Sequence, residues 1–349
     1  MTAVTSSDPL VSLAQTRTRG RVRRISVAGG LAIAVVVVFA LSLVVGAAVI
    51  SLPDVLSTLA GQGSRNTNYV ILELRLPRAV AGVLVGVAFG LSGAVFQNLL
   101  RNPLASPDVI GISTGASAAA VLGIVGLGLS GLAISGFALS GAVLTALAMY
   151  AIAWRNGVSG YRLILVGIGL NALLLSVISY FMTSAQVTNA QDALLWISGS
   201  LSGRNWNQVV PLLVSLVVLV PITMVLGRVL GMLGLGDDTA RGLGVPVVRV
   251  RLGLIVAAVM LAGVATAATG PIAFIALLAG PIGRGLAKDG SPALLPSALV
   301  GALIVLVADF VAQHAPFLPN LPVGVLTGAI GAPYLLWQLA RTNSGGQGG

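Results

Sequence analysis

The sequence predicts an all-α, polytopic membrane protein, and three observations support this fold class. Of the 349 residues, 56% are hydrophobic and only 8% are charged, whereas soluble domains carry about 25% charged residues. Apolar runs of membrane-spanning length alternate with short loops. Arginines stand mainly at the ends of those runs, where the positive-inside rule places them. We therefore expect about ten transmembrane helices, with both termini in the cytoplasm.

The N-terminal segment, residues 1–26, is polar and is expected to be cytoplasmic. An apolar run from 27 to 50 follows a basic stretch that contains Arg17, Arg19, Arg21, Arg23 and Arg24. A cleaved signal peptide is the alternative, but its hydrophobic region usually has only about 7–15 residues. The longer run favours a retained first span near 27–51.

The second span, near 78–99, has an unusual glycine pattern. The 22 residues between Arg78 and Arg101 carry no charge and would form about 33 Å of helix, enough to cross a hydrocarbon core of roughly 30 Å. Gly82, Gly86 and Gly90 recur at every fourth position, so a neighbouring helix can approach the backbone on that face. This span is therefore expected to pack against protein rather than lipid.

The remaining apolar runs complete a transmembrane domain over residues 27–341. We place these spans near 109–127, 131–153, 163–183, 207–227, 252–269, 271–284, 292–312 and 322–340. Gly270-Pro271 and Gly280-Pro281 are expected to break the eighth run into a short helix. With loops assigned alternately to the two sides, 15 of the 19 Lys and Arg residues are cytoplasmic, which supports this topology. The glycine-rich tail, 342–349, is expected to be disordered.

Two loops are too structured to be plain connectors. The outer loop at 192–206 places Trp196 and Trp206 around small polar residues; it forms either an interfacial aromatic belt or a short helix over the mouth of a transport pathway. The cytoplasmic loop 228–251 has acidic residues three and four positions before Arg241, the spacing of helical ion pairs. Since glycines divide it into short helices, it is either a docking surface or a solvated loop.

Several kinds of chemistry are missing from the sequence. With no cysteine and one histidine, His314, a cysteine or histidine metal cluster is excluded. The single lysine, Lys288, lies in GLAKDG, so no GxxxxGK[ST] phosphate loop exists. The net charge of +10 comes from span ends rather than from one basic surface, which argues against a nucleic-acid partner. We expect no catalytic site and no cofactor in this chain.

Two polar residues lie within the predicted spans. Asp309 is the only acidic residue in a span, and Gln313 and His314 follow it closely. A local pair or helix-end cap is favoured over a role in an ion relay. Asn171, in the fifth span, either forms a hydrogen bond between helices or lines a pathway, and Trp196 is a second candidate for the pathway.

Four segments of the chain are distinctive: LRLPRAVAGVLVGVAFGLSGAVFQNLLRNPLASPDVIGISTGA, LGLGDDTARGLGVP, TGPIAFIALLAGPIGR and LPVGVLTGAIGAPYLLWQL. In this order, over about residues 27–341, they resemble the FecCD family, the permease subunits of bacterial importers for iron-siderophores and cobalamin. The resemblance implies a type II ABC importer permease in the bacterial plasma membrane. It also implies a second permease subunit, cytoplasmic ATPase subunits that bind ATP-Mg, and an outer siderophore-binding protein.

The resemblance also assigns roles to particular residues. The coupling segment that contacts the ATPase would be Leu235, Gly236, Asp237, Asp238, Thr239, Ala240, Arg241, Leu243 and Gly244. Arg75 and Arg78 match the positions that dock the binding protein, although both could also anchor a span at the headgroups. Gln313 and His314 occupy a further docking position that is Arg in some members. The resemblance favours a ferric catecholate siderophore such as ferric enterobactin as cargo, and cobalamin or haem is the alternative cargo. An ion-coupled secondary carrier is the alternative class of protein.

Overall fold

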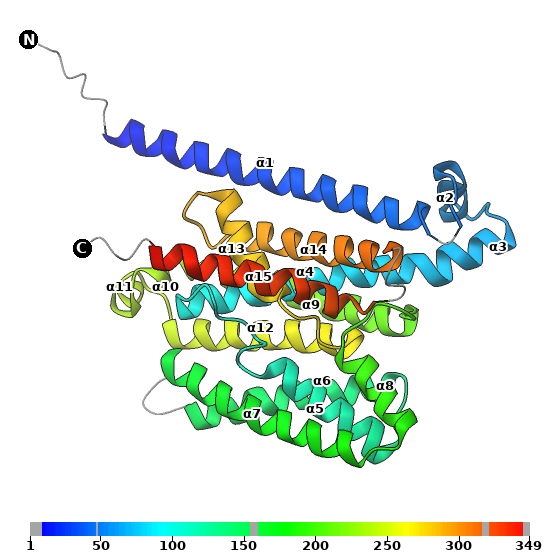
Figure 1. The fold of residues 1–349 in the computed structure, drawn as a ribbon. Helices are drawn as coiled ribbons and strands as arrows, with labels where there is room; N and C mark the ends of the chain where they lie inside the picture. Colours follow the sequence, from blue (N-terminus) through cyan, green and yellow to red (C-terminus); the bar gives the residue numbers. More distant parts are fainter. Residues whose placement is uncertain (1–8, 47, 154–159, 316–320, 345–349) are drawn as a thin grey trace, which may run out of the picture.

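The computed structural model describes residues 9–46, 48–153, 160–315 and 321–344, and within these ranges it contains helices and no strands (Figure 1). The long helices are α1 (Pro9–Val44), α4 (Leu76–Leu100), α6 (Leu132–Ala153), α7 (Gly160–Ser184), α9 (Trp206–Gly227), α12 (Val247–Thr269), α14 (Leu294–His314) and α15 (Val323–Ser344). The shorter ones are α2 (Leu52–Leu59), α3 (Arg65–Asn68), the π-helix η1 (Tyr69–Arg75), α5 (Ile112–Val121), the π-helix η2 (Leu122–Gly126), α8 (Val187–Ile197), α10 (Leu230–Gly234), α11 (Asp237–Gly242) and α13 (Ile275–Ala287).

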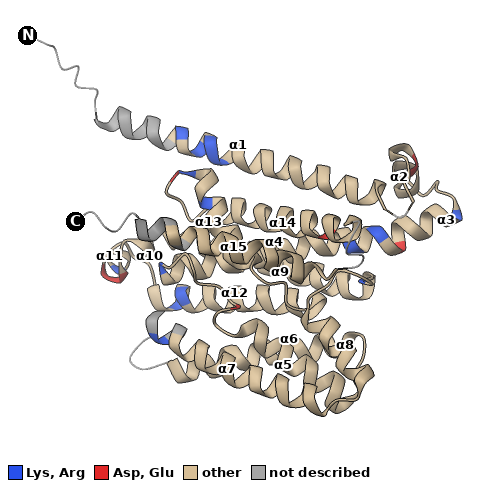
Figure 2. Cartoon of the chain, in the orientation of Figure 1, with Lys and Arg blue, Asp and Glu red and all other residues tan. Residues whose placement is uncertain are grey.

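The helices form one bundle with two distinct ends, which confirms the predicted fold class. Seven helices among the described residues are long and apolar enough to cross a membrane; α5 with η2, α13 and α15 occupy the other three predicted spans. The start of α1, the end of α15 and both α10 and α11 lie at one end of the bundle, and α2, α3 and α8 lie at the other (Figure 1). Most Lys and Arg residues gather toward the α11 end (Figure 2), which marks it as the cytoplasmic end.

The glycine face of α4 packs directly on neighbouring backbones, as predicted. A Cβ atom added at Gly86 would lie 2.4 Å from Ala302 Cα of α14, and one at Gly90 would lie 2.4 Å from Ser297 O. The approach is mutual, because a Cβ at Gly301 would lie 2.2 Å from Gly86 O. Such contact maximises dispersion attraction where water cannot drive association. Helix α4 is therefore the centre of the bundle.

Two helices are shorter than their predicted spans because non-helical backbone precedes them. Segment 101–111 precedes α5, and segment 270–274 precedes α13. Gly111 and Phe274, at the two helix starts, have positive φ angles of 90° and 68°. Irregular backbone at membrane depth is tolerated where protein covers it, and Ala105, Ile110 and Ile272 in these segments are indeed buried.

The prediction for the eighth run is half right. Gly270-Pro271 does separate α12 from α13, but Pro281 lies inside α13, which continues to Ala287. Proline has no N–H to donate to the carbonyl four residues earlier, here that of Leu277. Gln97 Nε2 of α4 donates to Leu277 O at 3.1 Å and to Ala276 O at 3.3 Å. A side chain of α4 thus supplies the hydrogen bond that Pro281 removes, and the helix does not break.

The two ends of the chain differ from the predicted boundaries. The first helix begins at Pro9 rather than near residue 27 and ends at Val44 rather than near 51, so much of the basic N-terminal segment continues the first span as helix. At the other end, α15 extends to Ser344, three residues into the tail that was predicted to be disordered. The rest of that tail, 345–349, lies outside the described residues.

Replacing Gly86 by alanine tests the central contact. The added methyl group would overlap Ala302 and Gly301 of α14, so we expect a loss of about 1–3 kcal/mol from overpacking. Thermal unfolding of the purified protein in detergent measures this loss as a lower midpoint. Gly169→Ala in α7 is the matched control, because no atom of a neighbouring segment lies within 4 Å of the added Cβ. Equal midpoints for the two variants would contradict the proposed packing.

Candidate functional site

The cytoplasmic loop folds into two short helices, as its glycines predict. Helix α10 follows α9, and α11 begins after Gly236, whose φ is 110°. Gly244, with a φ of 81°, lies two residues after the end of α11. Ala240 of α11 is fully buried and belongs to the main hydrophobic core, together with Leu230 and Leu233 of α10, so both short helices pack on the body of the bundle. The loop is a folded element that can present a defined surface.

Apolar side chains of this loop point into solvent. Leu235 is 66% exposed and Leu243 is 59% exposed, and the charged side chains of Asp238 and Arg241 stand between them in sequence, paired at 2.9 Å. Exposed leucines on a folded loop outside the membrane are typical of a surface that binds another protein. This geometry favours the docking interpretation of the loop over a solvated connector.

Asp237 anchors α11 to the transmembrane core. The sequence spacing suggested that Asp237 and Asp238 both pair with Arg241, but Asp237 pairs instead with Arg251 of α12, at 2.8 Å. The hydrogen bond from Arg251, followed by the nearby charges, lowers the pKa of Asp237 against the opposing effect of burial. The ion pair therefore stays formed at neutral pH and is lost only as the pH falls through this lowered pKa.

A second link joins the loop to α4. Arg101, in a left-handed conformation at the end of α4, donates from Nη2 to Leu233 O of α10 at 2.6 Å. Asp237 and Arg101 thus tie the two short helices to two different long helices. Arg101 and Arg251 were not predicted as functional residues, since their partners are 132 and 14 positions away in the sequence and no local spacing reveals them.

At the outer end, Arg75 closes the end of α1. Its guanidinium group donates to the carbonyl oxygens of Leu43 and Val44, the last residues of α1, and to that of Ala48 just beyond the helix. Carbonyls at a helix C-terminus have no partner within the helix. Gly46 permits this approach, because a Cβ there would lie 2.5 Å from Arg75 Nη2. This residue, predicted to dock a binding protein or to anchor the span, therefore has a structural role within the chain.

Arg78, the second predicted docking residue, forms a buried ion pair. Its Nη2 lies 2.8 Å from Asp309 Oδ1 of α14, and its Nε donates to both carboxylate oxygens. Asp309 is 2% exposed and also accepts from Gln313 Nε2 at 2.7 Å. The local partner Gln313 agrees with the sequence interpretation of Asp309. The pairing with Arg78, 231 positions away, was not predicted.

His314 lies at the same outer corner. Its Nδ1 donates to Phe310 O at 2.7 Å, and its ring centroid is 4.4 Å from that of Phe310. Gln313 is exposed, whereas His314 is half-buried. Of the four predicted docking residues, Arg78, Gln313 and His314 gather around Asp309 and α14, and Arg75 lies one helical turn away from Arg78.

The two candidate pathway residues both lie in contacts between segments. Thr114 Oγ1 of α5 donates to Asn171 Oδ1 of α7, so Asn171 does form a hydrogen bond between helices. Trp196 is 7% exposed, and its carbonyl oxygen lies 2.2 Å from the position of a Cβ at Gly270. It therefore faces protein rather than an interfacial belt, and it belongs to α8, a short helix at the outer end of the bundle.

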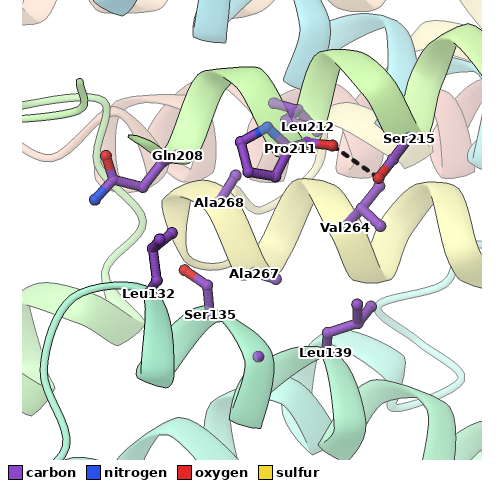
Figure 3. A pocket seen from close by; sticks show the side chains of 11 residues that line it. Leu132, Ser135, Leu139, Gln208, Pro211, Leu212, Ser215, Val264, Ala267 and Ala268 are labelled. Carbon is purple, nitrogen blue, oxygen red and sulfur yellow. Dashed lines mark hydrogen bonds between the residues drawn. The ribbon is translucent and has the colours of Figure 1, made fainter. Parts of the chain in front are cut away.

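Two cavities among the described residues bear on function. One, of about 210 Å³, lies between α6, α9 and α12 near their outer ends and has a mainly apolar lining that includes Leu132, Leu139 and Val264 (Figure 3). The Ser215 hydroxyl at its wall is already bonded to Pro211 O. The other, of about 400 Å³, lies beside α10 and is lined by Arg101, Arg284 and three amide side chains. Among the described residues, no group of three His, Asp or Glu could hold a metal ion.

These features define a class of protein. The chain is a multi-pass membrane protein with a folded cytoplasmic loop anchored to its core. The chain belongs to the FecCD transport family, which it matches over residues 34–341.

Several known proteins are similar to it. The ferric enterobactin transport system permease protein FepG of Escherichia coli is 40% identical over 83% of this chain and 88% of that protein. The iron(3+)-hydroxamate import system permease protein FhuG of Bacillus subtilis is 38% identical over 88% of this chain and 95% of that protein. A solved metal-chelate type ABC transporter in an inward-facing conformation has a TM-score of 0.80 and 25% identity, covering 90% of this chain and 99% of that one.

A double-mutant cycle tests the outer ion pair. Arg78→Met leaves the buried carboxylate of Asp309 without its cation, so we expect a loss of about 3–5 kcal/mol. Asp309→Leu in the Arg78→Met background should recover part of that stability, because no unpaired charge remains. Thermal unfolding of the four proteins measures the coupling, with the exposed Arg65→Met as control. Additive losses would show that the pair contributes no coupling.

A single spin label tests the anchor of α11. Because the chain has no cysteine, Leu243→Cys accepts one label on the exposed side of the loop. We expect Arg251→Gln to make this label more mobile, since Asp237 loses its partner, whereas Arg249→Gln should not. In the parent protein the label mobility should stay constant from pH 7 to pH 5 and rise only as the pH falls below 3.8, the ordinary pKa of Asp. A rise near pH 6 would contradict the anchor.

Proposed function

We propose that this chain is the permease subunit of an ATP-driven importer in the bacterial plasma membrane, with a ferric siderophore as cargo. The observation that carries the proposal is the cytoplasmic loop: a folded element with exposed leucines, bonded to α4 through Arg101 and to α12 through Asp237. A loop built in this way can receive movement from a partner and pass it to the membrane helices.

The proposal assigns ATP binding to separate cytoplasmic ATPase subunits. The coupling segment Leu235–Gly244 would dock on them through Leu235 and Leu243, with Asp238 and Arg241 at the rim. Apolar anchors with a charged rim are the usual anatomy of such contacts. In this scheme the chain itself hydrolyses no nucleotide, which agrees with the absence of a phosphate-loop motif from its sequence.

The opposite end would receive a siderophore-binding protein. We place that contact at the outer corner formed by Arg75, Arg78, Gln313 and His314. Their hydrogen bonds within the chain fix the shape of the corner, and the exposed amide of Gln313 is its most accessible group. A second permease, either a copy of this chain or a related one, would complete the pathway, with Asn171 and Trp196 as candidate lining residues.

The choice of cargo rests on the relatives. FepG is named for ferric enterobactin and FhuG for iron(3+)-hydroxamate, and both are iron-siderophore complexes. A ferric catecholate is our first choice, and cobalamin or haem is the second. The cargo is tested by uptake of each radiolabelled chelate into cells that lack the gene for this chain and carry it on a plasmid.

Replacing one exposed leucine tests the coupling assignment. We expect Leu243→Asp to reduce ATP-dependent uptake at least tenfold in proteoliposomes that contain the ATPase, the second permease and the binding protein, because a buried charge would weaken ATPase docking. Leu56→Asp, an equally exposed leucine of α2 at the outer end, should transport normally.

Two outcomes would contradict the proposal. Normal uptake by the Leu243→Asp variant would remove the loop from coupling. Uptake that survives depletion of ATP but stops when the proton gradient is dissipated would make the chain an ion-coupled secondary carrier.

A further inference from the structure

The larger cavity, beside α10, has the charge and hydrogen-bonding groups of an anion site. Its volume of about 400 Å³ falls within the range of small-molecule sites. It is lined by Arg101 from the end of α4, Arg284 from α13 and the amides Gln97, Asn98 and Asn102, with α10 on one side. No acidic residue is among its lining residues.

Among the described residues, the guanidinium groups of Arg101 and Arg284 form hydrogen bonds only with neutral groups. Arg101 donates to Leu233 O. Arg284 Nη2 donates to Gln97 Oε1 at 3.0 Å, and its Nη1 is buried without any hydrogen-bond partner. A buried donor that is left unsatisfied costs free energy, and the cost is larger for a charged group. An oxyanion in the cavity would remove that cost.

Two carboxylates at this end of the bundle are paired with other arginines. Asp289, in the loop after α13, lies 3.6 Å from Arg24 of α1 and accepts from Ser291. Asp237 pairs with Arg251. The charge of Arg101 contributes to lowering the pKa of Asp237, but neither carboxylate forms a hydrogen bond with an arginine of the cavity. The lining therefore holds two positive charges and no negative one, in a partly enclosed space where electrostatic attraction is stronger than in bulk water.

One amide group of the cavity, that of Asn102, has hydrogen-bonding capacity to spare, whereas Asn98 Nδ2 already donates to Ala94 O and Pro292 O. Asn102 Oδ1 accepts from the backbone N–H of Leu104, so the NH₂ group of Asn102 is available as a donor. Gln97 is fixed at both ends, by Arg284 and by the carbonyls of Ala276 and Leu277, so Arg284 is held in place. A rigid guanidinium fork and an amide donor match the geometry of a phosphate-type oxyanion.

We propose that this cavity binds a small oxyanion of the phosphate class from the cytoplasm, between Arg101 and Arg284. The site joins three elements: α4, α13 and the coupling-loop helix α10. A bound anion would bridge the ends of α4 and α13 and strengthen the link between α10 and the core.

Inorganic phosphate is the probe for this site. Thermal unfolding of the purified full chain in detergent is followed with increasing phosphate, with potassium chloride added to hold the ionic strength constant. We expect a saturable rise in the unfolding midpoint for the parent protein. Arg101→Gln and Arg284→Gln should each weaken the apparent affinity about tenfold or more, because each removes a charged donor, whereas Arg284→Lys should retain part of it.

Arg21→Gln is the matched control, because Arg21 is an exposed cytoplasmic arginine of α1 outside the cavity. It should bind phosphate as the parent protein does. Since Arg101 and Arg284 belong to different helices, one variant remains informative if the other fails to fold. The proposal is overturned if phosphate gives no saturable shift in the parent protein, or if both glutamine variants shift as the parent does.

Discussion

The contact between the glycine face of α4 and the backbones of α14 and α13 is the constraint on which the rest of the structure depends. A membrane offers little hydrophobic drive for one helix to join another, so close packing must supply the attraction. Gly86 and Gly90 let α14, and Gly93 lets α13, approach to distances that any side chain would prevent. This contact holds α4 in the centre and makes it a rigid connection between the two faces of the bundle.

Each end of α4 uses an arginine to extend that connection. At the outer end, Arg78 pairs with Asp309 of α14, and Arg75 satisfies the last carbonyls of α1. At the cytoplasmic end, Arg101 holds α10. Between them, Gln97 replaces the hydrogen bond that Pro281 removes from α13. One helix thus links the outer corner, α13 and the coupling loop, as the proposed function requires.

The sequence was sufficient for features that depend on local pattern. Apolar length and arginine placement predicted ten spans, each of which the described structure occupies with helix although several bounds differ, and the spacing of Gly82, Gly86 and Gly90 predicted which face of α4 packs on protein. Glycines at 236 and 244 predicted the division of the cytoplasmic loop. Features that depend on partners distant in the sequence could not be predicted. The pairs Arg78 with Asp309 and Asp237 with Arg251 join residues with no periodic relation. The continuity of α13 through Pro281 depends on Gln97, a side chain of another helix.

A pair of spin labels at Leu243 of the coupling loop and Leu74 of η1, both exposed, tests most directly whether the loop and α4 move as one unit. The distance between the labels would be measured in the assembled transporter without nucleotide and with ATP bound. The account predicts one unchanged distance within this chain, since Arg101, the glycine contact and Arg78 hold α4 rigid. A change of several ångströms between the two states would show that the loop moves independently of α4 and would contradict the account.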